Sequence, residues 1–342
     1  MLLGNNNTDE IIMLSMASLG GESVYISNNT RWIKHLYKGK EFLTYSTRLP
    51  FDDPRDIDKA DNKLFIRSIL SKYELPMIPW YLVNRQNCDL LKNENFDRWV
   101  IKPIAGMKGI SVIADISFDK LQKIIEQNDA YYFVEPFVLG RLYRVLLLNN
   151  RILSSYEKKA PVIVGDGSCS VKELLNQLFH KSNIENSFKL FDDNDVKERL
   201  SEQNIDFDSI LKNGERFEIT KVVNISRGAT WKGIEASLLN SRITSVCEQI
   251  SRIINLKLVG VDVIEDENGN IFILEANPSP GLYGHTAKLG FNGNLKSLDL
   301  TVSQEILKET MAFLFEDLVF DNPLFIHLMY DNYLNIREVY IK

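Results

Sequence analysis

The apolar positions of this chain follow two different periods, and each period predicts one type of element. Between Ile243 and Ile254 the apolar residues recur at helical spacing, which predicts an amphipathic helix over 241–256 that packs on a sheet. Helices are also predicted over 63–73, which ends before Pro76, over 118–127 and over 301–318.

Runs of β-branched and other apolar residues between turn formers predict strands. Residues 260–265 and 271–277 flank the turn formers at 266–270, and this pattern predicts an antiparallel hairpin. The segment 131–150 predicts two further strands, joined by a connector that contains a proline and a glycine.

The remaining segments have less regular patterns. Residues 1–61 predict a short α/β lobe in which 11–16 and 23–26 are strands around a glycine pair. The polar stretch 180–195 is rich in Asn, Asp, Lys and Ser and predicts a surface loop. The aromatic tail 319–342 has no role that its pattern reveals.

The composition is that of an ordinary globular protein, because 44% of the 342 residues are hydrophobic and 25% are charged. This length allows two or three lobes with their own cores. The net charge of −6 argues against nucleic acid as a partner, since binding a polyanion needs a basic surface.

The chain has three cysteines without paired spacing and no run of about twenty apolar residues. Its N-terminus lacks the basic and hydrophobic regions of a signal peptide. We therefore expect no membrane segment, reduced thiols and a cytoplasmic location.

The predicted hairpin carries three oxygen-bearing side chains at one end. Glu275 and Asn277 alternate along one strand and share a face, and the antiparallel partner strand can place Asp262 beside them. Two carboxylates and an amide are hard oxygen ligands that suit Mg2+ bound together with substrate phosphates. The alternative is that these residues are only solvated groups at the ends of strands.

A second motif runs from Arg98 to Val112. A short apolar strand leads to Lys102, and a loop with Gly106 and Gly109 follows. Glycines let the backbone approach phosphate oxygens, and a lysine supplies a mobile positive charge. The pattern is neither a Walker A nor a Rossmann motif, and a solvated lysine at a sheet edge is the simpler alternative.

These segments, in this order, resemble the ATP-grasp superfamily from Asn62 to Leu289, and most closely the ATP-grasp modules of cyanophycin synthetases and of bifunctional glutathione enzymes. The stretches 161–175, 213–215 and 224–228 add to the resemblance. It implies an α/β (α+β) protein with an ATP-grasp fold, in which two α+β lobes hold ATP between them after a short N-terminal lobe.

The resemblance also implies domain bounds. The N-terminal lobe is expected at 1–61, the ATP-grasp module at 62–318 with a lid subdomain at about 75–148, and the tail at 319–342. The residues that match ATP-contacting positions are Lys63 and Lys102 for the phosphates, Gly106 and Gly109 for the loop that closes over ATP, and Glu135 and Val138 for the adenine connector.

On the substrate side, Asp262, Glu275 and Asn277 match the metal triad of the family, which implies Mg2+ ions that bridge ATP phosphates. Two ions are expected, with Mn2+ as an alternative. Arg144 matches the arginine that holds the substrate carboxylate or the acyl phosphate made from it. The other matching residues on this side are Lys158, Asn224 and Gly228.

The chain departs from the family at four positions. Leu142 stands where many relatives have an acid on the ribose, a loss that weakens nucleotide binding by about tenfold to a hundredfold. Asn62 replaces an aspartate and Arg227 a threonine, so the substrate stays open. Gly260 stands where D-alanine–D-alanine ligases have an arginine, which argues against that branch.

The implied activity is ATP-dependent ligation of a carboxylate to an amine through an acyl phosphate. The expected partners are small carboxylate and amine substrates of amino-acid or small-peptide type, and the oligomeric state, including a homodimer, stays open. The alternatives are an ATP-grasp kinase for small molecules and a nucleotide-binding regulator without turnover.

Overall fold

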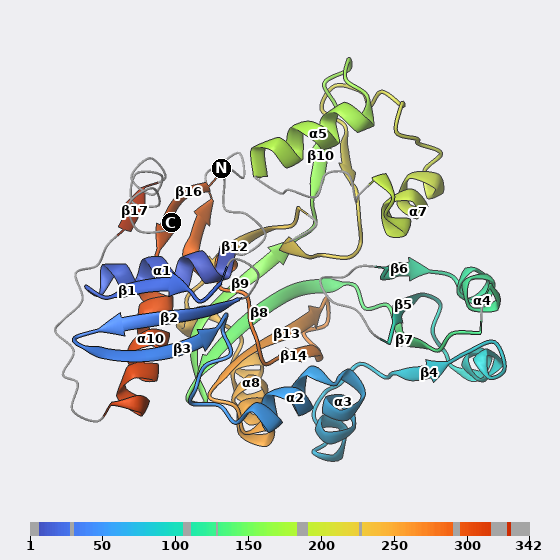
Figure 1. Cartoon of the computed structure of the whole chain (residues 1–342). Coiled ribbons are helices and arrows are strands. Elements are labelled where there is room, and N and C mark those ends of the chain that lie inside the picture. The colour runs from blue at the N-terminus through green and yellow to red at the C-terminus, as the bar shows by residue number, and fades with distance from the viewer. Residues whose placement is uncertain are drawn as a thin grey trace.

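The computed structural model is a mixed α+β structure with several antiparallel sheets (Figure 1). It describes residues 7–27, 31–104, 111–127, 129–182, 191–225, 228–289, 295–315 and 327–329.

A five-stranded antiparallel sheet, the central sheet, lies in the middle of the molecule (Figure 1). Its strands in spatial order are β12 (Thr230–Ile234), β9 (Arg151–Lys159), β8 (Gly140–Leu148), β13 (Leu258–Asp266) and β14 (Ile271–Asn277). One face packs against α8 (Ser241–Ile254), whose Ile243 and Ile250 share a core with Val261. The predicted hairpin is confirmed as β13 and β14, and the predicted helix over 241–256 as α8.

A second sheet forms the small lobe, which lies to one side of the central sheet (Figure 1). In spatial order it comprises β4 (Tyr81–Val83), β7 (Tyr132–Pro136), β5 (Trp99–Pro103) and β6 (Ile113–Ile116), covered by η1 (Cys88–Asn93) and α4 (Phe118–Glu126). Trp99 and Leu121 are fully buried in its core. α4 confirms the helix predicted over 118–127. The predicted lid subdomain at 75–148 also includes β8, but this strand pairs with β13 in the central sheet.

The N-terminal region differs from its prediction. The strand predicted over 11–16 is wrong, because these residues lie in α1 (Asn7–Ser18), while β1 (Glu22–Tyr25) agrees with the strand at 23–26. The run from Ile11 to Met16 is almost wholly apolar, so no period separates a buried helix from a strand. Asp9 and Glu10 in the first turn favour the helix through its dipole.

Helix α1 shares a core with α10 (Thr301–Leu314), whose Ile306 and Met311 pack with α1 residues. Around this core lie β2 (Trp32–Tyr37), β3 (Lys40–Tyr45), α9 (Tyr283–Thr286), β15 (Ala287–Leu289), β16 (Leu295–Asp299) and β17 (His327–Met329). The predicted division at residue 61 therefore crosses a continuous core, and it stays a prediction.

Residues 161–222 form a side lobe with a core of its own that includes Val171, Leu200 and Phe217. Its elements are β10 (Val162–Val164), α5 (Val171–Ser182), α7 (Asn194–Glu202) and β11 (Arg216–Glu218). The loop predicted at 180–195 is wrong at both ends, because α5 continues to Ser182 and α7 begins at Asn194. Residues 183–190 lie outside the described residues.

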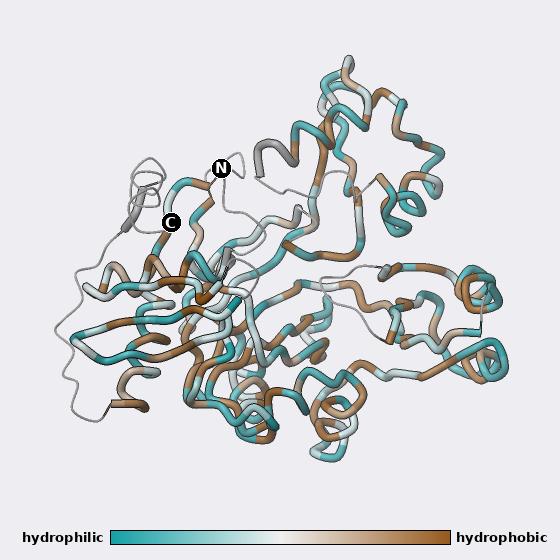
Figure 2. The backbone as a smooth tube through the Cα atoms, in the orientation of Figure 1, coloured by the Kyte–Doolittle hydropathy of each residue, from teal (hydrophilic) through white to brown (hydrophobic). Residues whose placement is uncertain are grey.

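Two short helices, α2 (Pro54–Asp61) and α3 (Lys63–Lys72), precede the small lobe. Helix α3 confirms the helix predicted over 63–73. A single helical turn, η3 (Ala236–Leu238), follows β12. Figure 2 shows apolar and polar residues alternating along the helices, as half-buried elements require. No helix among the described residues is long and apolar enough to cross a membrane.

His35 of β2 is a fully buried ionisable side chain. Its Nδ1 lies 2.7 Å from Ser23 Oγ, its Nε2 lies 3.0 Å from Thr44 Oγ1, and its ring stacks on Phe42. Burial lowers the pKa of His35 from 6.5 to about 4. Between these two values the unfolded chain binds a proton that the folded chain does not, so stability falls as the pH falls through this window.

We predict that His35→Gln removes this acid sensitivity. Between pH 6.5 and pH 5, His35 should cost the native protein about 2 kcal/mol of unfolding free energy that the variant does not lose. Urea unfolding of both proteins at pH 7 and pH 5 measures the difference. Burial raises the pKa of Asp52 to about 6, which makes stability rise as the pH falls. Both proteins contain Asp52, so this contribution cancels when their pH dependences are compared. Equal pH dependence in the two proteins would contradict the prediction.

Candidate active site

A row of charged side chains crosses three strands of the central sheet on the face opposite α8. The strand register places Asp262 of β13 directly opposite Arg144 of β8 and directly opposite Glu275 of β14. Residues paired in this way share a face of an antiparallel sheet. The hairpin therefore brings Asp262 beside Glu275 as its sequence pattern predicted, while the metal role of these residues stays a prediction.

Asp262 is held by two basic side chains. Arg144 donates from Nε and Nη2 to the two carboxylate oxygens at 2.6 and 2.7 Å, and Lys158 Nζ lies 2.9 Å from Oδ1. Both Asp262 and Lys158 are 8% exposed, so solvent screens the group little. Burial acts to raise the pKa of Asp262, but the charges of Arg144 and Lys158 outweigh it and hold that pKa well below its usual range.

In these contacts two basic side chains face one carboxylate, and burial lowers the pKa of Lys158 from its usual value. Gly260 makes room for this arrangement, because a Cβ atom there would lie 3.1 Å from Arg144 Nη1 and 2.8 Å from Pro280 Cβ. Gly260 thus lies beside the Arg144 guanidinium.

Glu275 and Asn277 extend the row on β14. Glu275 is exposed, and Asn277 is half-buried with its Oδ1 accepting a hydrogen bond from Ser279 N at 2.9 Å. A β-bulge makes Leu274 an extra residue of β14, between Ile273, which pairs with Val263, and Glu275. The bulge turns Glu275 to the same face as Asp262.

The donor set fits Mg2+ by its chemistry. Asp262 Oδ2 accepts one hydrogen bond among the described residues and keeps acceptor capacity, and Glu275 offers a solvated carboxylate. No three His, Cys, Asp or Glu side chains in the described ranges are grouped to hold a metal. The two carboxylates could hold a cation together with phosphate oxygens and water, and Asn277 on the same strand offers an amide oxygen that already accepts a hydrogen bond from Ser279 N.

The small lobe contributes Lys102, which lies on β5 and is held by Glu135 of β7. Lys102 Nζ donates to one oxygen of Glu135, whose side chain is almost fully buried. Arg67 of α3 forms an ion pair with the other oxygen. The Glu135 carboxylate therefore pairs with two cations. For the predicted contact with adenine, Glu135 would use its backbone groups.

Arg67 is a site residue that the sequence did not reveal. It is 5% exposed, its guanidinium lies 4.7 Å from the Phe133 ring, and its Nη2 donates to Leu274 O at 2.6 Å. One side chain thus joins the small lobe to the bulged residue of β14. One signal in the sequence could have revealed it: Arg67 lies between the apolar residues Ile66 and Leu70 of a predicted helix. An arginine is rarely buried at such a position unless it has a partner.

Lys63 is the first residue of α3, directly after the helix N-cap Asn62. The Asn62 side chain accepts hydrogen bonds from the backbone N–H groups of Leu64 and Phe65. Asparagine caps helices about as well as aspartate, so Asn62 keeps the structural role of the usual acid. Val138 lies half-buried in the connector between β7 and β8.

The predicted substrate loop follows the side lobe. Ala229 N donates to Asn224 O at 3.1 Å and closes the loop, and Gly228 has a φ of +90°, which favours glycine. The predicted residues Gly106 and Gly109, together with Arg227, lie outside the described residues.

Four ring side chains continue the polar face beyond Lys158. Tyr156 is in register with Arg144, and its ring centroid lies 4.7 Å from that of His285. Trp231 and Tyr283 have centroids 5.4 Å apart beside them. Burial, helped by the charges of Arg144 and Lys158, lowers the pKa of His285 well below its usual value, so this histidine is neutral. Tyr156 and Trp231 came from distant segments and gave no signal in sequence.

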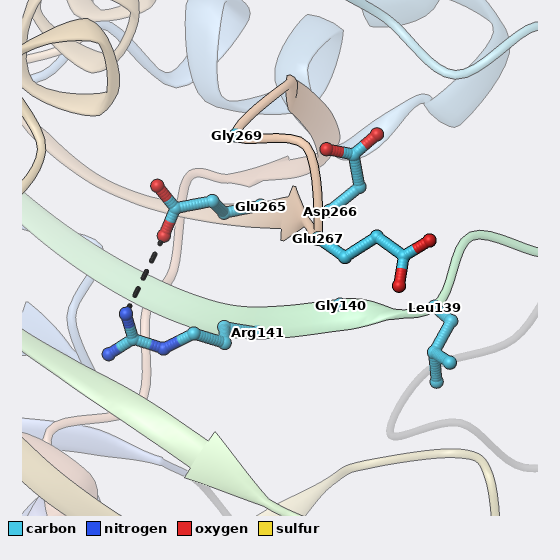
Figure 3. Close-up of a pocket in the computed structure, with 7 residues that line it drawn as sticks. All are labelled: Leu139, Gly140, Arg141, Glu265, Asp266, Glu267 and Gly269. Atoms are coloured by element: carbon cyan, nitrogen blue, oxygen red, sulfur yellow. Dashed lines mark ion pairs between the residues drawn. The ribbon is translucent and has the colours of Figure 1, made fainter.

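A surface hollow of about 460 Å³ lies at the start of β8, near the connector. Figure 3 shows Leu139, Gly140 and Arg141 on one side and the β13–β14 turn with Glu265, Asp266, Glu267 and Gly269 on the other. Arg141 forms an ion pair with Glu265 at 3.8 Å. Three acids against one arginine disfavour a phosphate group, so we place the candidate site at the Asp262 row.

Comparison with known proteins shows what the chain is similar to. Residues 201–300 match the family model of the RimK-like ATP-grasp domain. The cyanophycin synthetase of Crocosphaera subtropica is 26% identical over 214 residues, which cover 55% of this chain and 23% of that protein. The bifunctional glutathione biosynthesis protein of Clostridium perfringens is 24% identical over 217 residues, which cover 57% of this chain and 27% of that protein.

Among solved structures, the bifunctional glutathione synthetase of Pasteurella multocida aligns with a TM-score of 0.55 and 17% identity. The alignment covers 88% of this chain and 43% of that one. The alignment shows an ATP-grasp fold, as the sequence predicted, and the match to the ATP-grasp family model covers residues 201–300. It matches only about a quarter of the length of the two curated relatives.

We predict that Arg67→Met destabilises the protein far more than Arg85→Met. Removing Arg67 leaves the buried Glu135 carboxylate with one cation instead of two, which should cost about 3 kcal/mol of unfolding free energy. Arg85 pairs with Asp129 at 3.1 Å, but both side chains are more than half exposed, so its loss should cost less than about 1 kcal/mol. Urea unfolding compares the variants, and equal losses would refute the prediction.

Proposed function

We propose that this ATP-grasp protein is a ligase that joins a carboxylate to an amine at the expense of ATP, through an acyl phosphate. The observation that supports it most is the buried pair Arg144 and Lys158 on Asp262, beside the exposed Glu275. The face offers sites for a metal-bound phosphate and for an organic anion next to each other.

In this proposal the small lobe binds the nucleotide. Lys102 contacts the phosphates. Glu135 holds the Lys102 side chain in position, because the two form an ion pair in which the Glu135 carboxylate is almost fully buried. Lys63 adds a second charge from the start of α3, and Val138 contacts the adenine.

Asp262, Glu275 and Asn277 would hold the Mg2+ ions that accompany ATP. When bound, such ions neutralise charge on the phosphates as the γ-phosphoryl group is transferred. Asp262 stays ionised for this role over the physiological pH range, because its pKa is held well below the usual value by Arg144 and Lys158 against the opposing effect of burial.

Arg144 and Lys158 bind the substrate carboxylate and orient it toward ATP. A carboxylate oxygen forms a bond to the γ-phosphorus as the bond to ADP breaks, which gives the acyl phosphate. The amine nitrogen then bonds to the acyl carbon, phosphate leaves, and the amine proton passes to solvent. Tyr156, Trp231 and Tyr283 exclude water from this side, which protects the intermediate from hydrolysis.

Substrates of amino-acid or small-peptide type are supported by the relatives, whose names are cyanophycin synthetase and glutathione biosynthesis protein. Asn224 and Gly228 would line the substrate side. A cytoplasmic location is supported by the free thiols of Cys88, Cys169 and Cys247, which form no disulfide in the described residues.

The proposal is tested by phosphate and ADP release with Mg2+ATP and amino acids supplied in pairs. A ligase releases both products only when an acid and an amine are present together, and mass spectrometry finds a product lighter by one water than the sum of its substrates. A phosphorylated product would instead identify a kinase, and nucleotide binding without release would identify a regulator.

We predict that Glu275→Ala lowers kcat on the order of a hundredfold or more while the unfolding free energy stays within about 1 kcal/mol, because Glu275 is exposed. The matched control is Glu267→Ala, which removes an exposed carboxylate from the turn of the same hairpin. It should keep full activity. Turnover at the native rate in Glu275→Ala would remove Glu275 from the metal site.

A further inference from the structure

Asp195 is a buried carboxylate that neither the core nor the proposed chemistry explains. It lies in the first turn of α7 and is 2% exposed. The helix does not need it as a cap, because the Asp193 side chain already accepts hydrogen bonds from the backbone N–H groups of Asp195 and Val196 at 3.0 and 3.3 Å. Its carboxylate is therefore available for other partners.

Those partners come from two different parts of the molecule. Asp195 Oδ1 accepts a hydrogen bond from the backbone N–H of Ala114, on β6 of the small lobe, at 3.1 Å. Oδ2 accepts from the Thr220 hydroxyl and from the backbone N–H groups of Lys221 and Val222 at 3.1 and 3.4 Å. One carboxylate thus connects the small lobe to the segment that leads into Asn224.

The rest of α7 lies along the same lobe. Glu198 pairs with Lys120 at 2.5 Å, and Glu202 pairs with Arg98 at 3.3 Å. Figure 1 shows α7 beside β6 and α4. The two glutamate ion pairs are partly exposed, so water screens them. Asp195 is buried, so water does not screen its hydrogen bonds.

We propose that Asp195 is a positioning residue that couples nucleotide binding in the small lobe to the geometry of the loop 220–229. A carboxylate is rigid, so a shift of β6 that moves Oδ1 also moves Oδ2 and the backbone bound to it. The inference rests on the proposed function, since the small lobe is where ATP would bind. It gives the enzyme a way to order its substrate loop only when nucleotide is present.

Hydrogen–deuterium exchange of the whole chain, with and without Mg2+ and a non-hydrolysable ATP analogue, tests this coupling. In the native protein the nucleotide should slow exchange in β5 and β6 and, by about tenfold, in 220–229. In Asp195→Asn it should slow exchange in β5 and β6 alone. The asparagine keeps one acceptor oxygen, and its amide group faces either Ala114 N–H or the N–H groups of Lys221 and Val222 without bonding to them.

The matched control is Glu198→Gln on the same helix face, which should transmit protection as the native protein does. If Asp195→Asn does not fold, Thr220→Val removes one donor at constant volume and should reduce the protection of 220–229 without affecting β6. If the role of Asp195 is only structural, these variants lose stability but the nucleotide still slows exchange in 220–229. That result overturns the inference.

The failure of the inference is distinguishable from that of the proposed function. Protection of β5 and β6 without protection of 220–229 in the native protein overturns the coupling and leaves nucleotide binding standing. The absence of protection in the whole small lobe overturns nucleotide binding itself, and the coupling with it.

Discussion

The ion pairs of Asp262 are the interaction on which the candidate site depends. A carboxylate and two cations are removed from water together, which costs free energy that only close, well-directed contacts recover. The register of β8, β13 and β14 supplies that geometry, and Gly260 leaves the space for it. The central sheet thus does more than support the site, because its pairing determines which charges meet.

The lobes of the molecule are joined by buried charges of the same kind. Arg67 links Glu135 of the small lobe to the carbonyl of Leu274 in the central sheet. Asp195 links the small lobe to the segment that leads into Asn224. Charged groups are directional and have few acceptable partners, so they fix the relative placement of two lobes more narrowly than apolar contacts do.

The sequence predicted what depends on neighbouring residues. The hairpin, the helices α3, α4 and α8, and the pairing of Asp262 with Glu275 all follow from local period and turn chemistry. The strand expected at 11–16 was wrong because a wholly apolar run has no period. Arg67, Tyr156 and Asp195 were missed for another reason: their partners lie far away in sequence, and only the three-dimensional register reveals them.

The bulge at Leu274 also restricts how this hairpin can change in length. Side chains along a strand alternate between faces, so one residue gained or lost between the bulge and Asn277 would point Glu275 into the α8 core. The turn at 266–270 lies beyond the bulge and is free of that constraint. We therefore expect an insertion or deletion to be tolerated in the turn of this hairpin and to disrupt the site when it falls between Leu274 and Asn277.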